Sequence, residues 1–495
     1  RRWVRFAAVD INVAVNDMEF HRSPEEAKAL YEQADQRANA ALDDGDAAWQ
    51  TAYWANRSGG LVTAETAVKA LDRAGKRLEG LCANGGGSAR DHLRLGQVYA
   101  LIGRRVDAAN AFVQALDRKP DGLVLAETYA ELAGALAGLL SSGESSVADL
   151  CKTHIKAGAE TLSKLPTDTS PEVITKVAQF YFVGLSLARL HMELKAPMRL
   201  DGPLASWLFH AAHAIGEKQP ATDATDSPEV RGQRRLGHHL GKLLTAVAFV
   251  ARSMGPEVIG LDGVNALPGI LDAARDAFLV PGKEHSTDPA LPFFLCLNNV
   301  LTGNLMVARD EALQGLARYQ DNERLVDIYL LCCLENVYSG LDQERALKAL
   351  YNAIDTLAPD IAEGKLAGVG YALLLTKLQM ALYQTLDSGD AAGRAKALDA
   401  TVKAAQLTID RAPNWASGYW FQGMAALKGA TPAAAVAPYR RVVALQPANG
   451  EARYALALAL IASGSRDEGV KLMDALRGGS NVEAPKPQGP PAPKP

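Results

Sequence analysis

The sequence predicts an all-α protein that grows by the addition of helix hairpins. Hydrophobic residues make up 48% of the 495 residues but aromatic residues only 6%, and the apolar content leans on Ala and Leu. Both are good helix formers, and small side chains let helices approach closely. β-branched residues dominate no long window, so a large sheet is not expected. The length would make about three ordinary domains, but a residue pattern that recurs near both ends favours one array.

The first twenty residues differ from the rest of the chain. Apolar residues alternate there with polar or small ones, as in a half-buried strand. The apolar residues of this pattern are Val9, Ile11, Val13 and Val15. We expect an extended N-terminal arm here. It either folds against the body of the protein or adds a strand to a partner.

Helical signals run from Ser23 to residue 477 almost without interruption. Three helix starts combine a serine N-cap, a proline at the first helical position and an acid in the first turn, and they begin at Ser23, Ser170 and Ser227. Breaks between helices are mostly short, as hairpins demand. The expected regions are an extended arm at 1–20, helical repeats at 21–165, an irregular helical middle at 166–300, further repeats at 301–477, and a proline-rich polyproline II tail at 478–495.

One set of small, large and proline residues marks the stretch 89–121. In order, these residues are Leu95, Gly96, Tyr99, Ala108, Phe112, Ala115 and Pro120. Gly96 and Ala108 are small where two antiparallel helices would touch. Tyr99 and Phe112 are large where the space between hairpins must be filled, and Pro120 would end the second helix.

The same set recurs near the other end of the chain as Gly423, Ala435, Tyr439 and Pro447. The glycine and the proline are 24 residues apart in both copies. A third copy follows 34 residues later with Ala457, Gly469 and Met473. Between the ends the pattern weakens, although Ala346, Leu350, Ala353 and Pro359 echo the second helix of a unit.

This order and spacing resembles the tetratricopeptide repeat (TPR). The resemblance implies a right-handed α-solenoid of helix hairpins, in which the first helix of each unit lines a groove that holds a partner segment. Carried over residue by residue, the groove-facing candidates are Leu93, Gln97 and Leu101, with Arg90 and Arg94 at the edge, in the early unit; Trp420, Met424 and Leu427 in the unit after Pro413; and Tyr454, Leu458 and Ile461 in the next unit.

The character of the C-terminal candidates predicts the kind of partner. The best-known variant of the repeat clamps a carboxylate-ended peptide with Lys and Asn, whereas this chain offers Trp420, Phe421 and Met424. We therefore expect an apolar or aromatic segment, such as an amphipathic helix, and not an acidic tail. The alternative is that Trp420 and Tyr454 are covered by the protein's own chain.

Signatures of catalysis are missing from the sequence. It contains no Gly-x-x-x-x-Gly-Lys-[Ser/Thr], no Gly-x-Ser-x-Gly and no His-Glu-x-x-His. His210 and His213 would share a helix face, and His238 and His239 follow, but the residues before His210 are apolar, so packed or surface histidines are favoured over a metal site. The five scattered cysteines fit helix interiors better than disulfides or zinc ligands. No cofactor or metal is expected.

Charge and hydropathy argue against nucleic-acid binding and against a transmembrane segment. With 52 basic and 56 acidic residues the net charge is −4, and the densest basic stretch, Arg231, Arg234, Arg235 and Lys242, reads as a solvated helix face. No nucleic-acid partner is expected. The most apolar stretch, residues 243–251, is far shorter than the ~20 residues that a bilayer requires, so no transmembrane segment is expected.

These observations favour a non-catalytic scaffold or adaptor that binds protein partners within a larger assembly. The N-terminal arm and the proline-rich tail are further candidates for partner contact. One alternative is an enzyme, or a metal or small-molecule binder, with a site in the central helices around residues 210–239. Another is a periplasmic or envelope assembly factor, because the chain starts at Arg1 and a removed targeting segment would precede it. A cytoplasmic location is otherwise expected.

Overall fold

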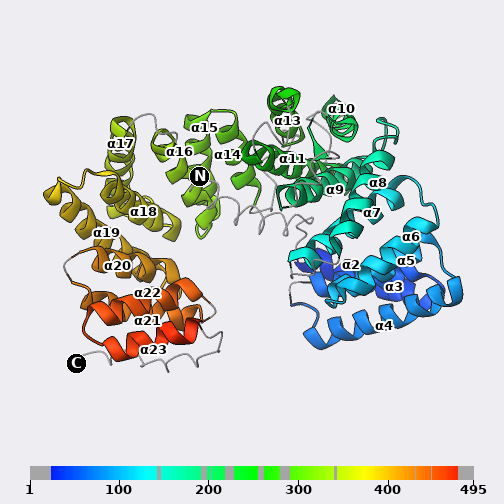
Figure 1. Cartoon of the computed structure of the whole chain (residues 1–495), viewed down its shortest axis with the longest axis horizontal. Coiled ribbons are helices and arrows are strands. Elements are labelled where there is room, and N and C mark those ends of the chain that lie inside the picture. The colour runs from blue at the N-terminus through cyan, green and yellow to red at the C-terminus, as the bar shows by residue number, and fades with distance from the viewer. Residues whose placement is uncertain are drawn as a thin grey trace. The chain divides into compact units, whose positions relative to one another are not determined.

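The computed structural model describes residues 24–58, 60–141, 147–190, 198–200, 202–217, 228–254, 261–278, 290–338, 343–429, 431–447 and 449–477. These residues form 21 α-helices and one short 3₁₀ helix, and no strand occurs among them (Figure 1). The expected strand-like arm and the proline-rich tail lie outside the described residues. The helices belong to two compact units, an N-terminal unit that ends at Thr302 and a C-terminal unit that begins at Gly303.

The N-terminal unit is a succession of helix hairpins. Its helices are α2 (Pro24–Ala40), α3 (Gly45–Arg57), α4 (Ala64–Cys82), α5 (Ala89–Leu101), α6 (Arg105–Asp117), α7 (Gly122–Ser141), α8 (Ala148–Leu162), α9 (Pro171–Leu190), α10 (Pro203–Glu217), α11 (Pro228–Met254), α13 (Leu261–Phe278) and α14 (Leu291–Leu301), with the 3₁₀ helix η1 (Ala83–Gly85) after α4. Each first helix packs against its hairpin partner, as α3 does against α4 and α5 against α6. The first helices α3, α5, α7, α9 and α11 also contact one another in series, so they form one layer.

The C-terminal unit repeats this arrangement. Its helices are α15 (Leu305–Arg318), α16 (Glu323–Tyr338), α17 (Gln343–Ala362), α18 (Val369–Thr385), α19 (Ala391–Arg411), α20 (Ala416–Lys428), α21 (Ala433–Leu445), α22 (Gly450–Ala462) and α23 (Arg466–Arg477). Every helix packs against the next one in the chain, and α16, α18 and α20 also touch in series. The unit is therefore a two-layered stack of hairpins (Figure 1).

Local sequence explains where helices begin. The three Ser-Pro-Glu segments do start helices, at the first residues of α2, α9 and α11. Ser88 forms a capping box with Asp91 at the start of α5, and its hydroxyl accepts from the Asp91 amide at 3.2 Å. Asn449 caps α22 in the same way, accepting from the Ala452 amide at 3.1 Å. These caps satisfy amides that have no partner inside the helix.

Close pairing of the helices depends on glycine. The ring of Phe112 in α6 lies against Gly96 in α5, where an added Cβ would be 2.4 Å from the ring. Tyr439 in α21 lies against Gly423 in α20 in the same manner, with 2.9 Å to an added Cβ. The recurring glycine in the sequence pattern thus marks the point where the partner helix places its aromatic ring.

Two sequence expectations differ from the structure. Pro359 lies inside α17 and does not end the helix, because α17 continues to Ala362. The most apolar long helix is α7 and not the stretch 243–251. Within the described chain, Gly122–Leu140 is one helix long and apolar enough to cross a membrane by length and composition, and half of it is buried inside the protein.

Candidate partner-binding groove

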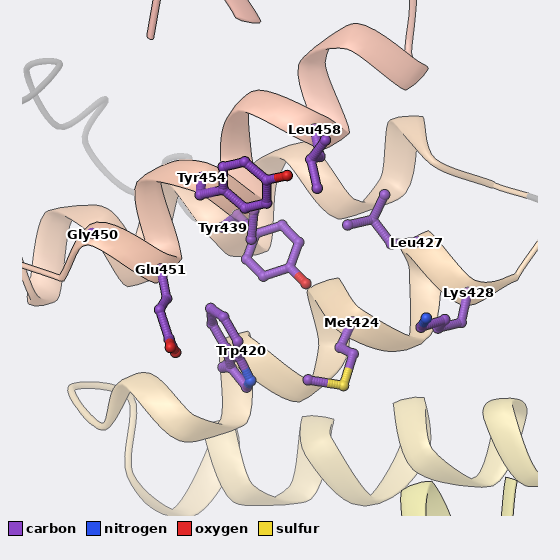
Figure 2. Close-up of a pocket in the computed structure, with 10 residues that line it drawn as sticks. Trp420, Met424, Leu427, Lys428, Tyr439, Gly450, Glu451, Tyr454 and Leu458 are labelled. Atoms are coloured by element: carbon purple, nitrogen blue, oxygen red, sulfur yellow. The ribbon is translucent and has the colours of Figure 1, made fainter. Parts of the chain in front are cut away.

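Helices α20, α21 and α22 enclose a groove of about 650 Å³ in the C-terminal unit. Figure 2 shows its walls and floor. The lining residues are Trp420, Met424, Leu427 and Lys428 from α20, Tyr439 from α21, and Gly450, Glu451, Tyr454, Ala455 and Leu458 from α22. The structure thus brings together five of the six C-terminal candidates predicted from sequence.

Helical spacing places the lining side chains of α20 on one wall of the groove and those of α22 on the other. Trp420, Met424 and Leu427 are four and three residues apart, so they share a face of α20. Tyr454 and Leu458 are four apart and share a face of α22, where they are 50% and 38% exposed. The exposed apolar side chains of α22 and the partly buried ones of α20 together leave an open apolar surface.

The floor of the groove is formed by Tyr439. Its ring packs edge-to-face against Trp420, with ring centroids 5.5 Å apart. A cluster of buried small and branched side chains holds these two rings from below: Ala416, Ala435, Val442, Val443, Ala452, Leu456 and Leu460. The aromatic pair is therefore held in place by the hairpin core before any partner arrives.

Polar atoms are sparse in the groove but well placed. The Tyr439 hydroxyl points into the groove beside Met424 and Leu427 (Figure 2). Burial raises the pKa of Tyr439 to about 12, so the hydroxyl keeps its proton at neutral pH and is able to donate a hydrogen bond. Among the described residues, no hydrogen bond engages the Tyr439 hydroxyl, the Tyr454 hydroxyl or the Trp420 indole nitrogen.

The two ends of the groove carry opposite charges. Glu451 lies at the end near Trp420, and Lys428 lies at the other end near Leu427 (Figure 2). Both side chains are exposed. Sequence reasoning missed these two residues, although Lys428 follows Met424 by four residues and Glu451 precedes Tyr454 by three. Helical spacing from the predicted residues would therefore have found them.

Ile461, the sixth C-terminal candidate, lies outside the groove. Its side chain packs against α23, since a Cβ added at Gly469 would be 2.6 Å from the Ile461 side chain. The second helix of the last hairpin therefore partly covers Ile461. Phe421, beside Trp420 in sequence, faces α18 instead, with its ring centroid 5.8 Å from the Lys377 ammonium.

Lys377 connects helices of the layer to which the groove helix α20 belongs. This α18 side chain is 8% exposed and pairs with two carboxylates of α16, Glu323 at 2.9 Å and Asp327 at 2.5 Å. Burial alone would lower the pKa of Lys377, but the two carboxylates outweigh it and raise the pKa. Ser417 in α20 donates to Glu323 at 3.0 Å. One ion cluster around the buried Lys377 ammonium thus connects α16, α18 and α20.

The N-terminal candidates do not form a comparable groove. Leu93 is fully buried, and Arg94 and Gln97 are 8% and 7% exposed, so the expectation that Arg94 lies at a groove edge is corrected. Arg90 and Leu101 are exposed. The physical reason is that side chains of two other helices, α3 and α7, hold Arg94 inside the helix layer.

Contacts of Arg94 show how it is held. It pairs with Asp46 of α3 at 2.7 Å and with Glu127 of α7 at 3.0 Å. Its guanidinium lies over the ring of Trp49, 4.1 Å from the centroid. Gln97 donates to Glu127 at 3.0 Å. These polar groups are satisfied by one another and offer little to a ligand.

The central histidines show no metal-binding arrangement. Among the described residues, no group of three His, Cys, Asp or Glu side chains is placed to hold a metal ion. His210 and His213 lie on α10, which packs against α8, α9 and α13, whereas α11 carries His238 and His239. Burial, with the charges of Lys242 and Lys176, lowers the pKa of His239 well below its ordinary value.

The basic stretch of α11 is not a free solvated face. Lys242 is 2% exposed. Arg235 forms an ion pair with Glu26 of α2 at 2.9 Å. The expectation of a solvated basic face is therefore corrected for these two residues, because one is buried and the other is bound within the unit.

Fold and groove together define this protein as a TPR-like α-solenoid. It is all-α in its described residues, its helices pack in consecutive pairs, and its glycine–aromatic hairpin contacts recur in both units. No protein-family model matches the chain, and no curated protein matches it.

Comparison with solved structures finds similar chains. One is from the crystal structure of the APC/C hetero-tetramer Cut9-Hcn1, with 14% sequence identity, 93% of this chain and 96% of that chain covered, and a TM-score of 0.24. Another is yeast Tom70, with 12% identity, 92% and 93% covered, and a TM-score of 0.23.

Proposed function

We propose that this protein is a non-catalytic scaffold that holds an apolar segment of a protein partner in the groove of α20, α21 and α22. The observation that carries the proposal is the open apolar surface of Trp420, Tyr454 and Leu458 above an ordered aromatic floor. An amphipathic helix laid into such a groove would bury its apolar face against both walls.

Energetics favour a short partner segment with a few large side chains. Burying each such side chain contributes ~1.5–3 kcal/mol before the cost of ordering. The groove needs little reorganisation, because Trp420 and Tyr439 are already packed against each other. A partner that places two or three large apolar side chains here would bind through a small number of dominant contacts.

A double substitution tests the proposal. Trp420→Ala with Tyr454→Ala removes the aromatic side chain from each wall, and we expect capture of partners from the native source to fall at least about tenfold. Capture is measured by affinity purification with quantitative mass spectrometry. The affinity for each identified partner segment is then measured by calorimetry.

The control is Tyr351→Ala. Tyr351 is 44% exposed on α17 and does not line the groove, so its loss should leave partner capture unchanged. Circular dichroism melting must show that all variants stay folded. If the double variant captures the same partners as the wild type in the same amounts, the groove is not the binding site.

A further inference from the structure

We propose that part of the proline-rich segment 484–495 of this same chain occupies the groove as a polyproline II helix when no partner is bound. This inference rests on the groove of the proposed function and adds its regulation. A partner would then bind only by displacing the chain's own segment. The proposal stands on groove chemistry, on the composition of the segment, on where the described chain ends, and on charge.

Groove chemistry fits a polyproline II ligand. Such a helix has no internal hydrogen bonds, so its carbonyl groups need external donors, and it docks in grooves lined by aromatic side chains. Trp420 and Tyr454 provide an aromatic ring on each wall, whereas Tyr439, which is 2% exposed, offers only its hydroxyl from the floor. Their indole N–H and hydroxyl groups are donors that, within the described chain, take part in no hydrogen bond.

The segment has the matching composition. Residues 484–495 read APKPQGPPAPKP and contain six prolines: Pro485, Pro487, Pro490, Pro491, Pro493 and Pro495. No large apolar side chain occurs among these twelve residues, so they would gain little by packing as a helix. Proline rings instead stack well on aromatic faces, and the proline-rich backbone loses little entropy on binding.

The path from α23 to the groove is short. A three-residue loop joins α22 to α23, and Gly469 near the start of α23 lies against Ala457 and Ile461 near the end of α22. The two helices therefore run antiparallel, so Arg477 lies beside the start of α22, where Glu451 stands at the end of the groove.

Chain length is sufficient for this path. The six residues 478–483 can span about 19 Å at the polyproline II rise of about 3.1 Å per residue. This exceeds the ~10 Å diameter of the helix that must be crossed. The segment would thus enter the groove at its Glu451 end.

The surface beyond α23 needs no cover from the segment. This last described helix already exposes a row of charged side chains to solvent, namely Arg466, Asp467, Glu468, Lys471 and Asp474. Such a polar face is how an end repeat is normally solvated. The apolar groove is therefore the better place for the segment.

Charge gives the orientation. The first lysine of the segment, Lys486, would lie at the end where the chain enters, beside the exposed carboxylate of Glu451. An exposed ion pair of this kind changes affinity only modestly, by about twofold to fivefold. Reversing the charge of each partner tests whether the two side chains attract each other.

The test uses two full-length proteins and one labelled probe. The first protein is the wild type. The second carries serine in place of Pro485, Pro487, Pro490, Pro491 and Pro493. The probe is a fluorescent peptide of residues 481–495, and its binding is followed by anisotropy. A segment attached in the same chain acts at an effective concentration near millimolar, so we expect the probe to bind the serine-substituted protein at least about tenfold more tightly than the wild type.

Further substitutions locate the contact within the serine-substituted protein. Trp420→Ala should weaken probe binding at least about tenfold, and the matched control Tyr351→Ala should leave it unchanged. Glu451→Lys should weaken binding by about twofold to fivefold, and a probe with Lys486→Glu should bind that variant better than the original probe does.

Three results would overturn the inference. They are equal binding of the probe to both proteins, no binding to either, and a wild type that sediments as a dimer while the serine-substituted protein is a monomer. The last result would place the segment in a second copy. If the probe does not bind as expected while the double variant Trp420→Ala with Tyr454→Ala still loses partner capture, only this inference is wrong and the proposed function stands. If both fail, the proposed function falls with it.

Discussion

Single glycines control how closely the helices of a hairpin approach. Gly96→Ala would place a methyl group 2.4 Å from the Phe112 ring, which is buried and cannot move away freely. We expect this substitution to lower the free energy of unfolding by about 1–3 kcal/mol, measured by urea denaturation.

Gly134 provides the matched control for that prediction. It lies in the exposed face of α7, and nothing lies within 4 Å of an added Cβ. Gly134→Ala should stabilise the protein by up to about 1 kcal/mol, because alanine favours the helix. If both glycines responded alike, the close contact with Phe112 would not be the cause.

At the scale of elements, a chain of buried charges connects the first helices of the N-terminal unit. Glu127 of α7 accepts from Arg94 and Gln97 of α5, and Lys176 of α9 lies 3.8 Å away. Burial alone would raise the pKa of Glu127, but the charges of Lys176 and Arg94 outweigh it and lower the pKa below its ordinary value of 4.5. Three helices, α5, α7 and α9, thus meet at one ionised carboxylate.

Glu127→Gln tests the role of this carboxylate through pH. Because the folded pKa lies below the unfolded one, the ionised carboxylate contributes stability above about pH 4.5, and the contribution disappears as the pH falls through the folded pKa. At neutral pH the substitution should cost about 1–3 kcal/mol, measured by thermal unfolding. The difference from the wild type should shrink as the pH falls below about 4.5 and through the lower folded pKa.

Glu65→Gln is the control for the pH experiment. Glu65 pairs with Lys69 on the surface of α4, where both side chains are mostly exposed. Its substitution should change stability by less than about 1 kcal/mol at any pH. A difference between Glu127→Gln and the wild type that stays constant with pH would show that the charge of Glu127 is not what connects the helices.

At the scale of the whole molecule, stability should be local. Each hairpin contacts mainly its neighbours in the chain, so a defect should spread to adjacent hairpins and then fade. Gly423→Ala crowds Tyr439, with 2.9 Å from the added Cβ to its ring. We expect faster amide hydrogen exchange in α20 to α23 and unchanged exchange in α3 to α6. Equal acceleration throughout would contradict this local behaviour.

Spacing along the chain was sufficient to predict the hairpins, whereas the two walls of the groove were predicted from the resemblance to the tetratricopeptide repeat. The recurring glycine and aromatic positions predicted a hairpin near each end of the chain, whereas the contacts of Phe112 with Gly96 and of Tyr439 with Gly423 are findings of the structure. The helical period places Trp420, Met424 and Leu427 on one face of α20.

Side chains whose role depends on neighbouring helices were predicted poorly. Arg94 and Gln97 occupy first-helix positions just as Trp420 does, yet partners on α3 and α7 bury them. Ile461 has the spacing of a groove residue, but α23 partly covers it. No pattern within one helix reveals what the next helix brings to it.

The amino-acid sequence by itself determined that this protein is an array of helix hairpins, because helix propensity, caps and the spacing of glycine and aromatic residues act within one or two helices. Tertiary structure alone decided which first-helix surface stays open. In the N-terminal unit, charged side chains from α3, α5 and α7 satisfy one another and close the surface. In the C-terminal unit, α20 and α22 present apolar side chains that do not fill the space between them, and a groove remains.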